Sequence, residues 1–364
     1  MTKVNHQDLL KFRDEIDAID AQVLALLSRR AECAKAIGRI KQNQTVAVPF
    51  YRPEREKAVL ERLLALNKGP LPDKEIHRLF REVMSACLAL EMPMDIAYLG
   101  PEGTFTQAAV LKQFGHSVNT VAMRTIPDVF KSVQSENAHF GVVPIENSTE
   151  GVITHTFDML LKSDLKICGE ILLRIQHNLL SNAEDLSSVN VVYAHEQALA
   201  QCRNWLNRYV PHAECKPVAS NGLAADLAVQ DANAAAIAGQ MASDLYGLSI
   251  LAAGIEDEAN NTTRFLVIGT QELQATGEDK TSLVVSSNNH PGLLYELLEP
   301  ISRHNINMTR LESRPARQGI WEYVFFIDIE GHRSEQKVQS LLREMQDIAT
   351  LFKVLGSYPA GKVF

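Results

Sequence analysis

The sequence predicts a multidomain protein with an all-helical part, then an α/β part, then a small α+β part. A helical repeat runs through the N-terminal part, short apolar strands alternate with helices in the middle, and the C-terminal part has the order βαββαβ. We expect domains at residues 1–94, 95–275 and 281–364, with a polar linker at residues 276–280.

The N-terminal part is expected to begin with one long helix over residues 8–41, where apolar side chains recur every three or four residues without a proline. Shorter helices are expected over residues 54–66 and 73–91. The first helix would be about 50 Å long, which is more than so small a domain can cover. We therefore expect its apolar stripe to pack against a second copy of the chain in a homodimer.

In the middle part, strands are expected at Ile96–Leu99, Phe140–Ile145 and Val191–Ala194, each followed by a polar or glycine-bearing turn and a helix. This alternation predicts a parallel sheet, whose ligands bind at the carboxyl ends of the strands. The C-terminal part is expected to form a ferredoxin-like fold. Its expected strands span residues 282–287, 307–313, 321–330 and 353–358, and its expected helices span 292–304 and 334–351.

Composition excludes several classes of protein. The net charge of −8 disfavours nonspecific binding to nucleic acid. No apolar run is long enough to span a bilayer, and the N-terminus lacks a secretory signal, so we expect no membrane association and a cytoplasmic location. The cysteines are scattered without a C-x-x-C pair, and the stretch 195–199 lacks the second histidine of a zinc helix. We therefore expect no disulfide framework, no metal and no cofactor.

Charged side chains form a pattern on the expected N-terminal helices. Arg30 and Lys41 are separated by nearly three whole turns, so they share a face. Arg13 lies about 25 Å from Arg30 along the helix axis, so one small ligand can contact both only if Arg13 comes from a partner chain. Cys87 and Glu91 share a face of the third helix. From composition alone, a solvated cationic face also explains the basic residues.

With these residues, positions 8–92 resemble the all-helical chorismate mutase family. The motifs that carry the resemblance are Arg13, Ser28-Arg29-Arg30, Gly38-Arg-Ile-Lys41, Pro53-Glu-Arg-Glu56 and Cys87-x-x-x-Glu91. The resemblance implies that Arg30 and the second subunit's Arg13 bind the substrate carboxylates, and that Lys41 and Glu91 flank the ether oxygen. It also implies that Glu56 accepts from the ring hydroxyl, with Arg52, Arg55 and Cys87 nearby.

The implied chemistry suits this residue set. A Claisen rearrangement needs no nucleophile, only a compact substrate conformer and donors directed at the ether oxygen, and guanidinium groups bind carboxylates well. Three positions depart from a common family pattern: Arg52 replaces an Asp, Cys87 a Ser and Glu91 a Gln. Only a protonated acid donates to the ether oxygen, so we expect mutase activity to fall with rising pH and Glu91→Gln to flatten the profile.

Four motifs follow strands of the middle part. They are Gly100-Pro-Glu-Gly-Thr-Phe-Thr106, Pro144-Ile-Glu-Asn-Ser148, His195-Glu-Gln-Ala198 and Thr262-Thr-Arg-Phe265. Each alone has a structural explanation: a turn, a helix N-cap, a loop histidine or an ion pair. Together, in this order, they resemble the prephenate dehydratase family, a two-lobed fold similar to periplasmic binding proteins with the substrate in the cleft between lobes.

The implied reaction removes a ring hydroxyl and carbon dioxide and is driven by aromatisation, so the departing oxygen needs a proton donor. The resemblance implies that Thr263 lies beside this oxygen. It implies that Thr104, Asn147, Ser148 and Arg264 hold the carboxylates or shape the pocket. Because a threonine is a poor acid, the proton donor stays open between Thr263 and another group such as Glu146.

The stretches 289–294 and 311–315 resemble the ACT domain family, which binds phenylalanine between paired domains. The implied effector contacts are Pro291, Gly292, Leu293, Leu294, Glu312, Ser313, Arg314 and Pro315. The whole chain thus resembles the bifunctional chorismate mutase/prephenate dehydratase family with phenylalanine inhibition. Two alternatives stay open: a non-catalytic amino-acid sensor, which a chorismate-consumption assay would reveal, and an enzyme that prefers arogenate, which a substrate comparison would reveal.

Overall fold

The computed structural model describes residues 6–43, 50–149, 151–315 and 323–361, and these form two compact units. The first unit contains residues 1–52, 59–94 and 114–118 within those limits, and the second contains the remainder. None of the helices in the described parts is both long and apolar enough to cross a bilayer.

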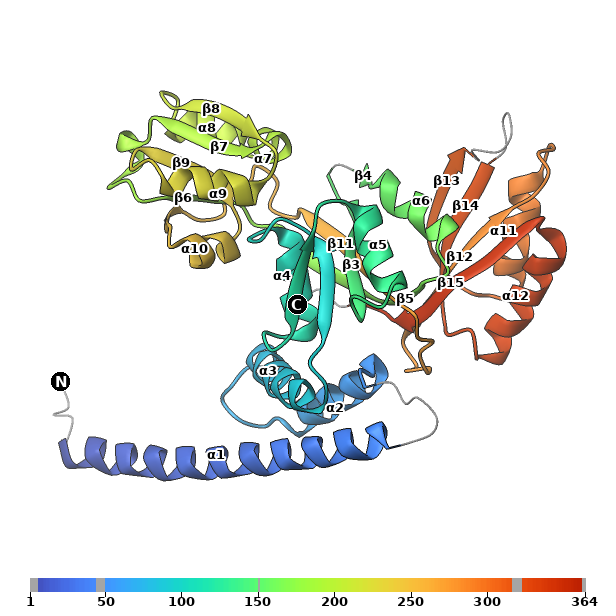
Figure 1. Cartoon of the computed structure of the whole chain (residues 1–364). Helices are drawn as coiled ribbons and strands as arrows, with labels where there is room; N and C mark the ends of the chain where they lie inside the picture. Colours follow the sequence, from blue (N-terminus) through green and yellow to red (C-terminus); the bar gives the residue numbers. More distant parts are fainter. Residues whose placement is uncertain (1–5, 44–49, 150, 316–322, 362–364) are drawn as a thin grey trace. The chain divides into compact units, whose positions relative to one another are not determined.

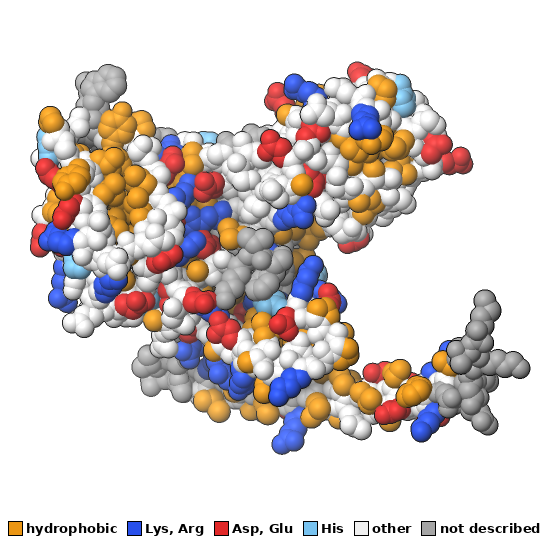
Figure 2. Space-filling model, turned by 180° about the vertical axis from the view of Figure 1, so that it is seen from behind, with side chains coloured by type: hydrophobic (Ala, Val, Ile, Leu, Met, Phe, Trp, Pro, Cys, Tyr) orange, Lys and Arg blue, Asp and Glu red, His pale blue; other side chains and the backbone are white. Residues whose placement is uncertain are grey.

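The first unit is helical, as the sequence predicts. Its helices are α1 (His6–Gln42), the later turns of α2 (Pro53–Leu66) and α3 (Asp73–Glu91) (Figure 1). The start of α2 follows from Pro53 at its first helical position, where the missing N–H costs no hydrogen bond. The apolar side chains of α1 remain largely exposed: Phe12, Leu24 and Leu26 each expose more than 60% of their surface. Hydrophobic side chains are visible on the surface of α1 in Figure 2.

The first sheet of the second unit contains, in the described chain, six strands in the order β2-β1-β3-β11-β5, with β4 beside β3. The strands are β1 (Asp95–Leu99), β2 (Asn119–Met123), β3 (Phe140–Asn147), β4 (Gly151–Val152), β5 (Lys166–Arg174) and β11 (Thr262–Gly269). Helices α4 (Phe105–Phe114), α5 (Ile126–Gln134) and α6 (Thr154–Lys162) belong to this lobe.

This sheet is mixed, whereas the strand–helix alternation predicts a parallel one. Strand β1 is parallel to β2 and β3, but β11 is antiparallel to both β3 and β5. The reason is topological: after β5 the chain builds a second sheet and returns as β11, which enters the first sheet from the opposite end. The carboxyl ends of β1 and β3 and the amino end of β11 therefore meet at one edge.

The second sheet has the order β10-β6-β9-β7-β8. Its strands are β6 (Asn178–Ser181), β7 (Val191–His195), β8 (Glu214–Val218), β9 (Ala234–Ala238) and β10 (Ser249–Ala252). Its helices are α7 (Glu196–Gln201), α8 (Arg203–Tyr209), α9 (Asn221–Val229) and α10 (Gln240–Tyr246). Every residue of β9 is buried, which fits a central strand made of Ala and Ile.

The third sheet has the antiparallel order β13-β14-β12-β15, which confirms the ferredoxin-like fold. Its elements are β12 (Asp279–Ser286), α11 (Leu293–Arg303), β13 (Met308–Pro315), β14 (Tyr323–Glu330), α12 (Gln336–Ile348) and β15 (Leu351–Pro359). The first two residues of the strand expected at 321–330 lie outside the described residues.

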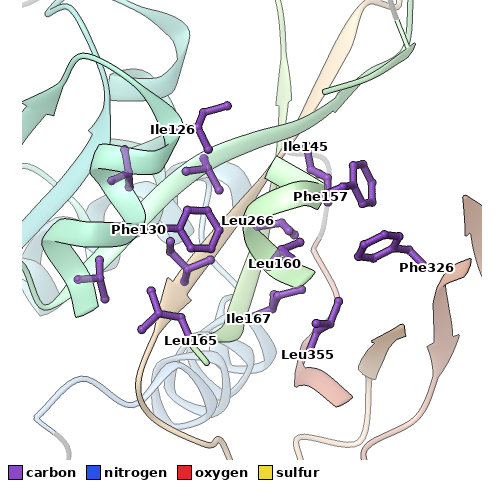
Figure 3. Close-up of a cluster of buried hydrophobic side chains, with 14 of the residues drawn as sticks. Ile126, Phe130, Ile145, Phe157, Leu160, Leu165, Ile167, Leu266, Phe326 and Leu355 are labelled. Carbon is purple, nitrogen blue, oxygen red and sulfur yellow. The ribbon is translucent and has the colours of Figure 1, made fainter. Parts of the chain in front are cut away.

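The first and third sheets share one hydrophobic core (Figure 3). Phe157 and Leu160 of α6 and Leu266 of β11 pack with Phe326 of β14 and Leu355 of β15. The rings of Phe157 and Phe326 meet edge to face with centroids 4.8 Å apart. Strand β11 and the C-terminal domain are therefore held together by side-chain packing as well as by the chain connection.

Candidate active sites

A pair of opposite charges joins α1 to α3 in the first unit. Lys41 Nζ donates to Glu91 Oε2 at 3.1 Å and to the Phe50 carbonyl oxygen at 3.3 Å. The side chains of Lys41 and Glu91 are only 16% and 12% exposed. Gly38, one turn before Lys41, permits this approach, because a Cβ added there would lie 3.0 Å from Glu91 Cα. The sequence pattern therefore holds a cation and a carboxyl group together at a close helix crossing.

Arg30 of α1 and Cys87 of α3 lie along the same contact between these two helices. Arg30 Nη1 donates to the Val83 carbonyl oxygen at 3.3 Å, and Cys87 is buried on α3. Val83, Cys87 and Glu91 are spaced by four residues, so they lie on the side of α3 that meets α1. Arg30 and Lys41 thus contact α3 at Val83 and Glu91, and Cys87 lies between these two positions on α3.

The other residues expected at this site lie elsewhere on the chain. Arg13 is exposed, about 25 Å from Arg30 along α1. Arg52 is half-buried at the N-cap of α2 and does not cap that helix with its side chain. Arg55 is exposed and Glu56 half-buried, and both occupy the first turn of α2, in the other compact unit.

In the second unit, the strand register places Thr263 of β11 directly opposite Asn147 of β3. Asn147 Nδ2 donates to Thr263 Oγ1 at 2.7 Å and to Asn261 Oδ1 at 2.9 Å. Thr263 is 7% exposed. Because Thr263 Oγ accepts from the amide, its own hydrogen is left to donate to another group. The geometry makes Thr263 a donor aimed away from Asn147.

A ring of hydrogen bonds fixes the Asn147 amide. Thr149 Oγ1 donates to Asn147 Oδ1 at 2.6 Å, Gln201 Nε2 donates to Thr149 Oγ1 at 3.0 Å, and Asn261 Nδ2 donates to Gln201 Oε1 at 3.1 Å. Each member therefore has its donor and acceptor roles set by its neighbours. Sequence reasoning missed Thr149, Asn261 and Gln201 as functional residues. Their only signal was position, since each lies within four residues of a recognised motif.

His177 joins this ring through Gln201, the last residue of α7 in the second lobe. Its Nε2 lies 2.8 Å from Gln201 Oε1, and its ring meets the edge of Phe105 with centroids 5.4 Å apart. Because Gln201 Oε1 is the acceptor of its amide, His177 Nε2 carries the hydrogen. Burial lowers the pKa of His177, which stays neutral. His195, by contrast, caps α7 by accepting from the Gln197 N–H, as expected for a loop histidine.

Ser148 and Thr104 lie at the same edge of the sheet. Ser148 Oγ accepts from the Thr262 N–H at 2.9 Å, which continues the pairing of β3 with β11. Thr104 follows β1 and precedes α4, and its hydroxyl donates to the Pro101 carbonyl oxygen. Because β1 and β3 are parallel neighbours, their carboxyl ends share one edge, which places the turn at Thr104 beside the end of β3.

Glu146 and Arg264 do not join this hydrogen-bonded cluster, and their expected contacts with the substrate stay predictions. They stand opposite one another in the register, one residue from Asn147 and Thr263, so their side chains leave the sheet on its other face. Arg264 donates to Glu170 Oε2 at 2.7 Å, to Asp328 Oδ2 at 2.6 Å and to Tyr358 Oη at 3.0 Å.

The environment of Arg264 is that of a structural cation. Burial alone would lower its pKa, but Tyr358, Asp328 and Glu170 together raise it above the ordinary value. For Tyr358, burial disfavours the charged phenolate and so raises the pKa, and the side chain remains a neutral hydroxyl. The guanidinium is therefore permanently charged and holds β11 both to β5, through Glu170, and to the C-terminal domain, through Asp328 and Tyr358.

The expected effector residues lie in two places on the C-terminal domain. Pro291 and Gly292 precede α11, with Gly292 in the left-handed region at φ 96°, and Leu294 is 39% exposed. Leu293, the first residue of α11, is buried in the domain core. The second group, Glu312, Ser313, Arg314 and Pro315, lies on β13, which pairs only with β14 among the described strands.

Within the described residues, no three His, Cys, Asp or Glu side chains gather in a way that would hold a metal ion. Comparison with known families matches three profiles: chorismate mutase type II over residues 12–92, prephenate dehydratase over 96–273 and the ACT domain over 281–346. These matches follow one another along the chain in the order of its helical, α/β and α+β parts.

Whole-chain relatives carry all three parts. A bifunctional chorismate mutase/prephenate dehydratase of Neisseria gonorrhoeae is 51% identical over 99% of this chain and 99% of its own. One of Pseudomonas aeruginosa is also 51% identical, over 97% of this chain and 98% of its own. Among solved structures, a prephenate dehydratase of Arthrobacter aurescens in complex with L-Phe superposes with a TM-score of 0.68 at 32% identity, over 73% of this chain and 89% of that one.

Proposed function

This chain belongs to the family of bifunctional chorismate mutase/prephenate dehydratases, and we propose that its two activities reside in the two side-chain clusters described above. It rearranges chorismate to prephenate, then dehydrates and decarboxylates prephenate to phenylpyruvate. We assign the first reaction to residues 1–94, the second to residues 95–275 and regulation to residues 281–364. The enzyme is proposed to work in the cytoplasm, which suits its five free cysteines.

The mutase assignment is supported by the Lys41–Glu91 pair at the α1–α3 seam. Lys41 uses two of its three N–H donors on Glu91 and the Phe50 carbonyl, which fixes the ammonium and leaves the third donor for an ether oxygen. Arg30, on the same side of α1, supplies a guanidinium for a carboxylate. The cluster performs no proton relay, because the rearrangement needs only a held conformer and a stabilised ether oxygen.

The exposed apolar stripe of α1 supports a homodimer. A second copy laid along α1 would bury side chains such as Phe12 and Leu26, and it would bring Arg13 of the partner subunit toward the Arg30 end of the site. Glu56 and Arg55 of the α2 first turn and Arg52 complete the proposed chorismate contacts.

The dehydratase assignment is supported by the hydrogen bond from Asn147 Nδ2 to Thr263 Oγ1. Because Thr263 accepts that bond, its hydrogen is directed outward, where it can donate to the departing ring hydroxyl. The C–O bond breaks as the ring carboxylate leaves as carbon dioxide, and the C–C bonding electrons complete the aromatic ring. The hydroxyl leaves as water after taking up a proton. Ser148 and Thr104 are proposed to contact the substrate carboxylates.

Phenylalanine is proposed as the effector of the C-terminal domain. The Arthrobacter prephenate dehydratase was solved with L-Phe, and an ACT profile matches this part of the chain. We place the contacts in the loop at Pro291, Gly292 and Leu294 and on β13 at residues 312–315, because these residues are at the domain surface. Leu293 stays a proposed contact, with its side chain buried in the domain core.

One experiment tests both assignments: product analysis after incubation with chorismate. The wild type is expected to yield phenylpyruvate, Arg30→Ala to leave chorismate unconsumed, and Thr263→Ala to accumulate prephenate with dehydratase turnover reduced about a hundredfold or more. Arg29→Ala and Thr262→Ala are matched controls, since they remove the same groups from neighbouring positions. Phenylpyruvate formation by Thr263→Ala at the wild-type rate would refute the Thr263 assignment, and comparison of prephenate with arogenate would identify the preferred substrate.

A further inference from the structure

Strands β3 and β11 have two functionally different faces at the point where they pair. Asn147 and Thr263 lie on the face with the hydrogen-bond ring, whereas Glu146 and Arg264 leave the opposite face toward the C-terminal domain. Asn147 and Thr263 are therefore each one peptide bond from a residue held by the C-terminal domain. A shift on one face is passed to the other through a rigid backbone.

The contact made by Arg264 is an anchor. Its guanidinium bonds Glu170, Asp328 and Tyr358, and Lys280 Nζ adds a second cation at 2.7 Å from Glu170. The Glu170 side chain is completely buried. Separating buried, mutually bonded charges leaves each of them unpaired in a poorly polar environment, so this contact is costly to break. It fixes β11 to β14 and β15 directly and to β12 through Glu170 and Lys280.

The contact made by Glu146 is of a different kind. Its carboxylate lies 3.2 Å from Arg310 Nε, and the side chain is 39% exposed. Arg310 stacks over the Phe157 ring at 4.8 Å, and its buried Nη2 has no hydrogen-bond partner among the described residues. The Arg310 side chain is 12% exposed, but water screens the more exposed Glu146 carboxylate, so this single ion pair is cheaper to rearrange than the Arg264 network. It is the adjustable contact beside a fixed one.

Arg310 and Arg314 lie on β13 with the spacing that puts them on one face, and both guanidinium groups lie over the ring of Phe157. Arg310 holds Glu146, just before the catalytic turn. Arg314 Nη1 donates to the Thr154 carbonyl oxygen at 3.2 Å, just after the turn. Strand β13, at the edge of the C-terminal sheet, therefore contacts both ends of the segment that carries Asn147, Ser148 and Thr149.

We infer that Arg310 is a positioning residue of the dehydratase: through Glu146 it sets the placement of Asn147 and its hydrogen bond to Thr263, and it couples movement of β13 to the catalytic turn. The coupling to phenylalanine rests on the proposed function, because the effector contacts on β13 begin two residues after Arg310. Binding at residues 312–315 that shifts β13 alters the Arg310–Glu146 pair, while the Arg264 anchor stays in place.

The test compares Arg310→Gln, Arg310→Lys and Glu146→Gln with Arg333→Gln in the full-length enzyme. Arg333 is the matched control, because it also pairs with a carboxylate of the dehydratase domain, Glu272 at 2.6 Å, but on the surface. For each variant, kcat and KM for prephenate are measured with and without saturating phenylalanine, and phenylalanine binding is measured by calorimetry. Mutase activity reports that the chain is folded.

For Arg310→Gln and Glu146→Gln we expect kcat to fall about tenfold with KM within about twofold, because alignment rather than affinity is lost. Phenylalanine is expected to bind still, yet to change the rate less than about twofold, compared with the 5- to 150-fold range of a typical allosteric coupling. Arg310→Lys is expected to keep most of both properties, and Arg333→Gln to match the wild type.

A kcat for Arg310→Gln within about twofold of the wild type overturns the positioning role. Loss of phenylalanine binding in Arg310→Gln overturns the coupling role, since Arg310 would then be an effector ligand. If the wild type binds no phenylalanine, the proposed effector fails instead, and the kcat comparison still decides the positioning role.

Discussion

Gly38→Ala tests whether the close approach of α1 and α3 creates the mutase site. An Ala Cβ at this position would lie 3.0 Å from Glu91 Cα and 3.3 Å from both Glu91 Cβ and the Glu91 carbonyl oxygen. Two of these atoms belong to the backbone of α3, so no side-chain rotation relieves the crowding. The end of α3 has to move outward by about 0.5 Å to restore ordinary contact distances.

Two opposing effects set the magnitude. Ala is about 1 kcal/mol better than Gly in a helix interior, which stabilises α1. Overpacking at a crowded contact costs about 1–3 kcal/mol. The net change in unfolding free energy is therefore a loss of at most about 2 kcal/mol, and the chain remains folded. Displacing Glu91 from Lys41 by about 0.5 Å is expected to lower mutase kcat/KM about tenfold, because the donors are no longer aimed at one oxygen.

The assay follows chorismate loss and phenylpyruvate formation from prephenate with the same preparation. Dehydratase activity is the internal control and is expected to stay unchanged. Gly69→Ala in the same helical unit is the matched control, because a Cβ there meets only Asn67 Oδ1 at 3.8 Å. Mutase kcat/KM in Gly38→Ala equal to that of Gly69→Ala would refute the reasoning, since the site would then tolerate a wider helix crossing.

Three further outcomes follow from the buried and charged groups. Arg264→Met is expected to lower the unfolding free energy in urea by about 3–5 kcal/mol, against less than about 1 kcal/mol for Arg333→Gln; equal losses would contradict the anchor. Burial lowers the folded pKa of His177 from its ordinary 6.5, so below that pH the unfolded chain binds a proton that the folded chain does not, and stability falls as the pH drops. His177→Gln is expected to lose less stability than the wild type between pH 7.5 and 5.5, about the window of that titration, and parallel losses would count against it. Glu91→Ala is expected to lower mutase kcat/KM about tenfold, because it removes the carboxylate that fixes the Lys41 ammonium, and an unchanged value would contradict the role of the pair.

The helices of the first unit were predictable because their signals are local. An apolar repeat, Pro53 at a helix start and prolines before α3 depend only on neighbouring residues, and α1, α2 and α3 agree with the expected ranges to within two residues. The ferredoxin-like order of the C-terminal strands was predictable for the same reason. The direction of β11 was not, because it depends on where the chain re-enters the sheet after building the second lobe.

Some residues of the candidate sites were also predictable from local motifs, and others were not. Asn147, Thr263, Lys41 and Glu91 were named from motifs, and the structure shows that each contacts its neighbour in the cluster, although their roles remain proposals. The ring that contains Asn261 and Gln201 could not be derived, because its members are 60 residues apart and meet only when β11 pairs with β3.

By itself the sequence determined the residue types, the local elements and, through its motifs, the family. The tertiary structure alone decided which face of strands β3 and β11 is covered by the C-terminal domain and which face carries the catalytic cluster. Alternation along a strand puts Asn147 and Glu146 on opposite faces but does not say which face is covered. Packing of Asp328 and Tyr358 against Arg264 covered one face and left Thr263 on the other. That choice depends on contacts between residues far apart in the chain, which no local pattern records.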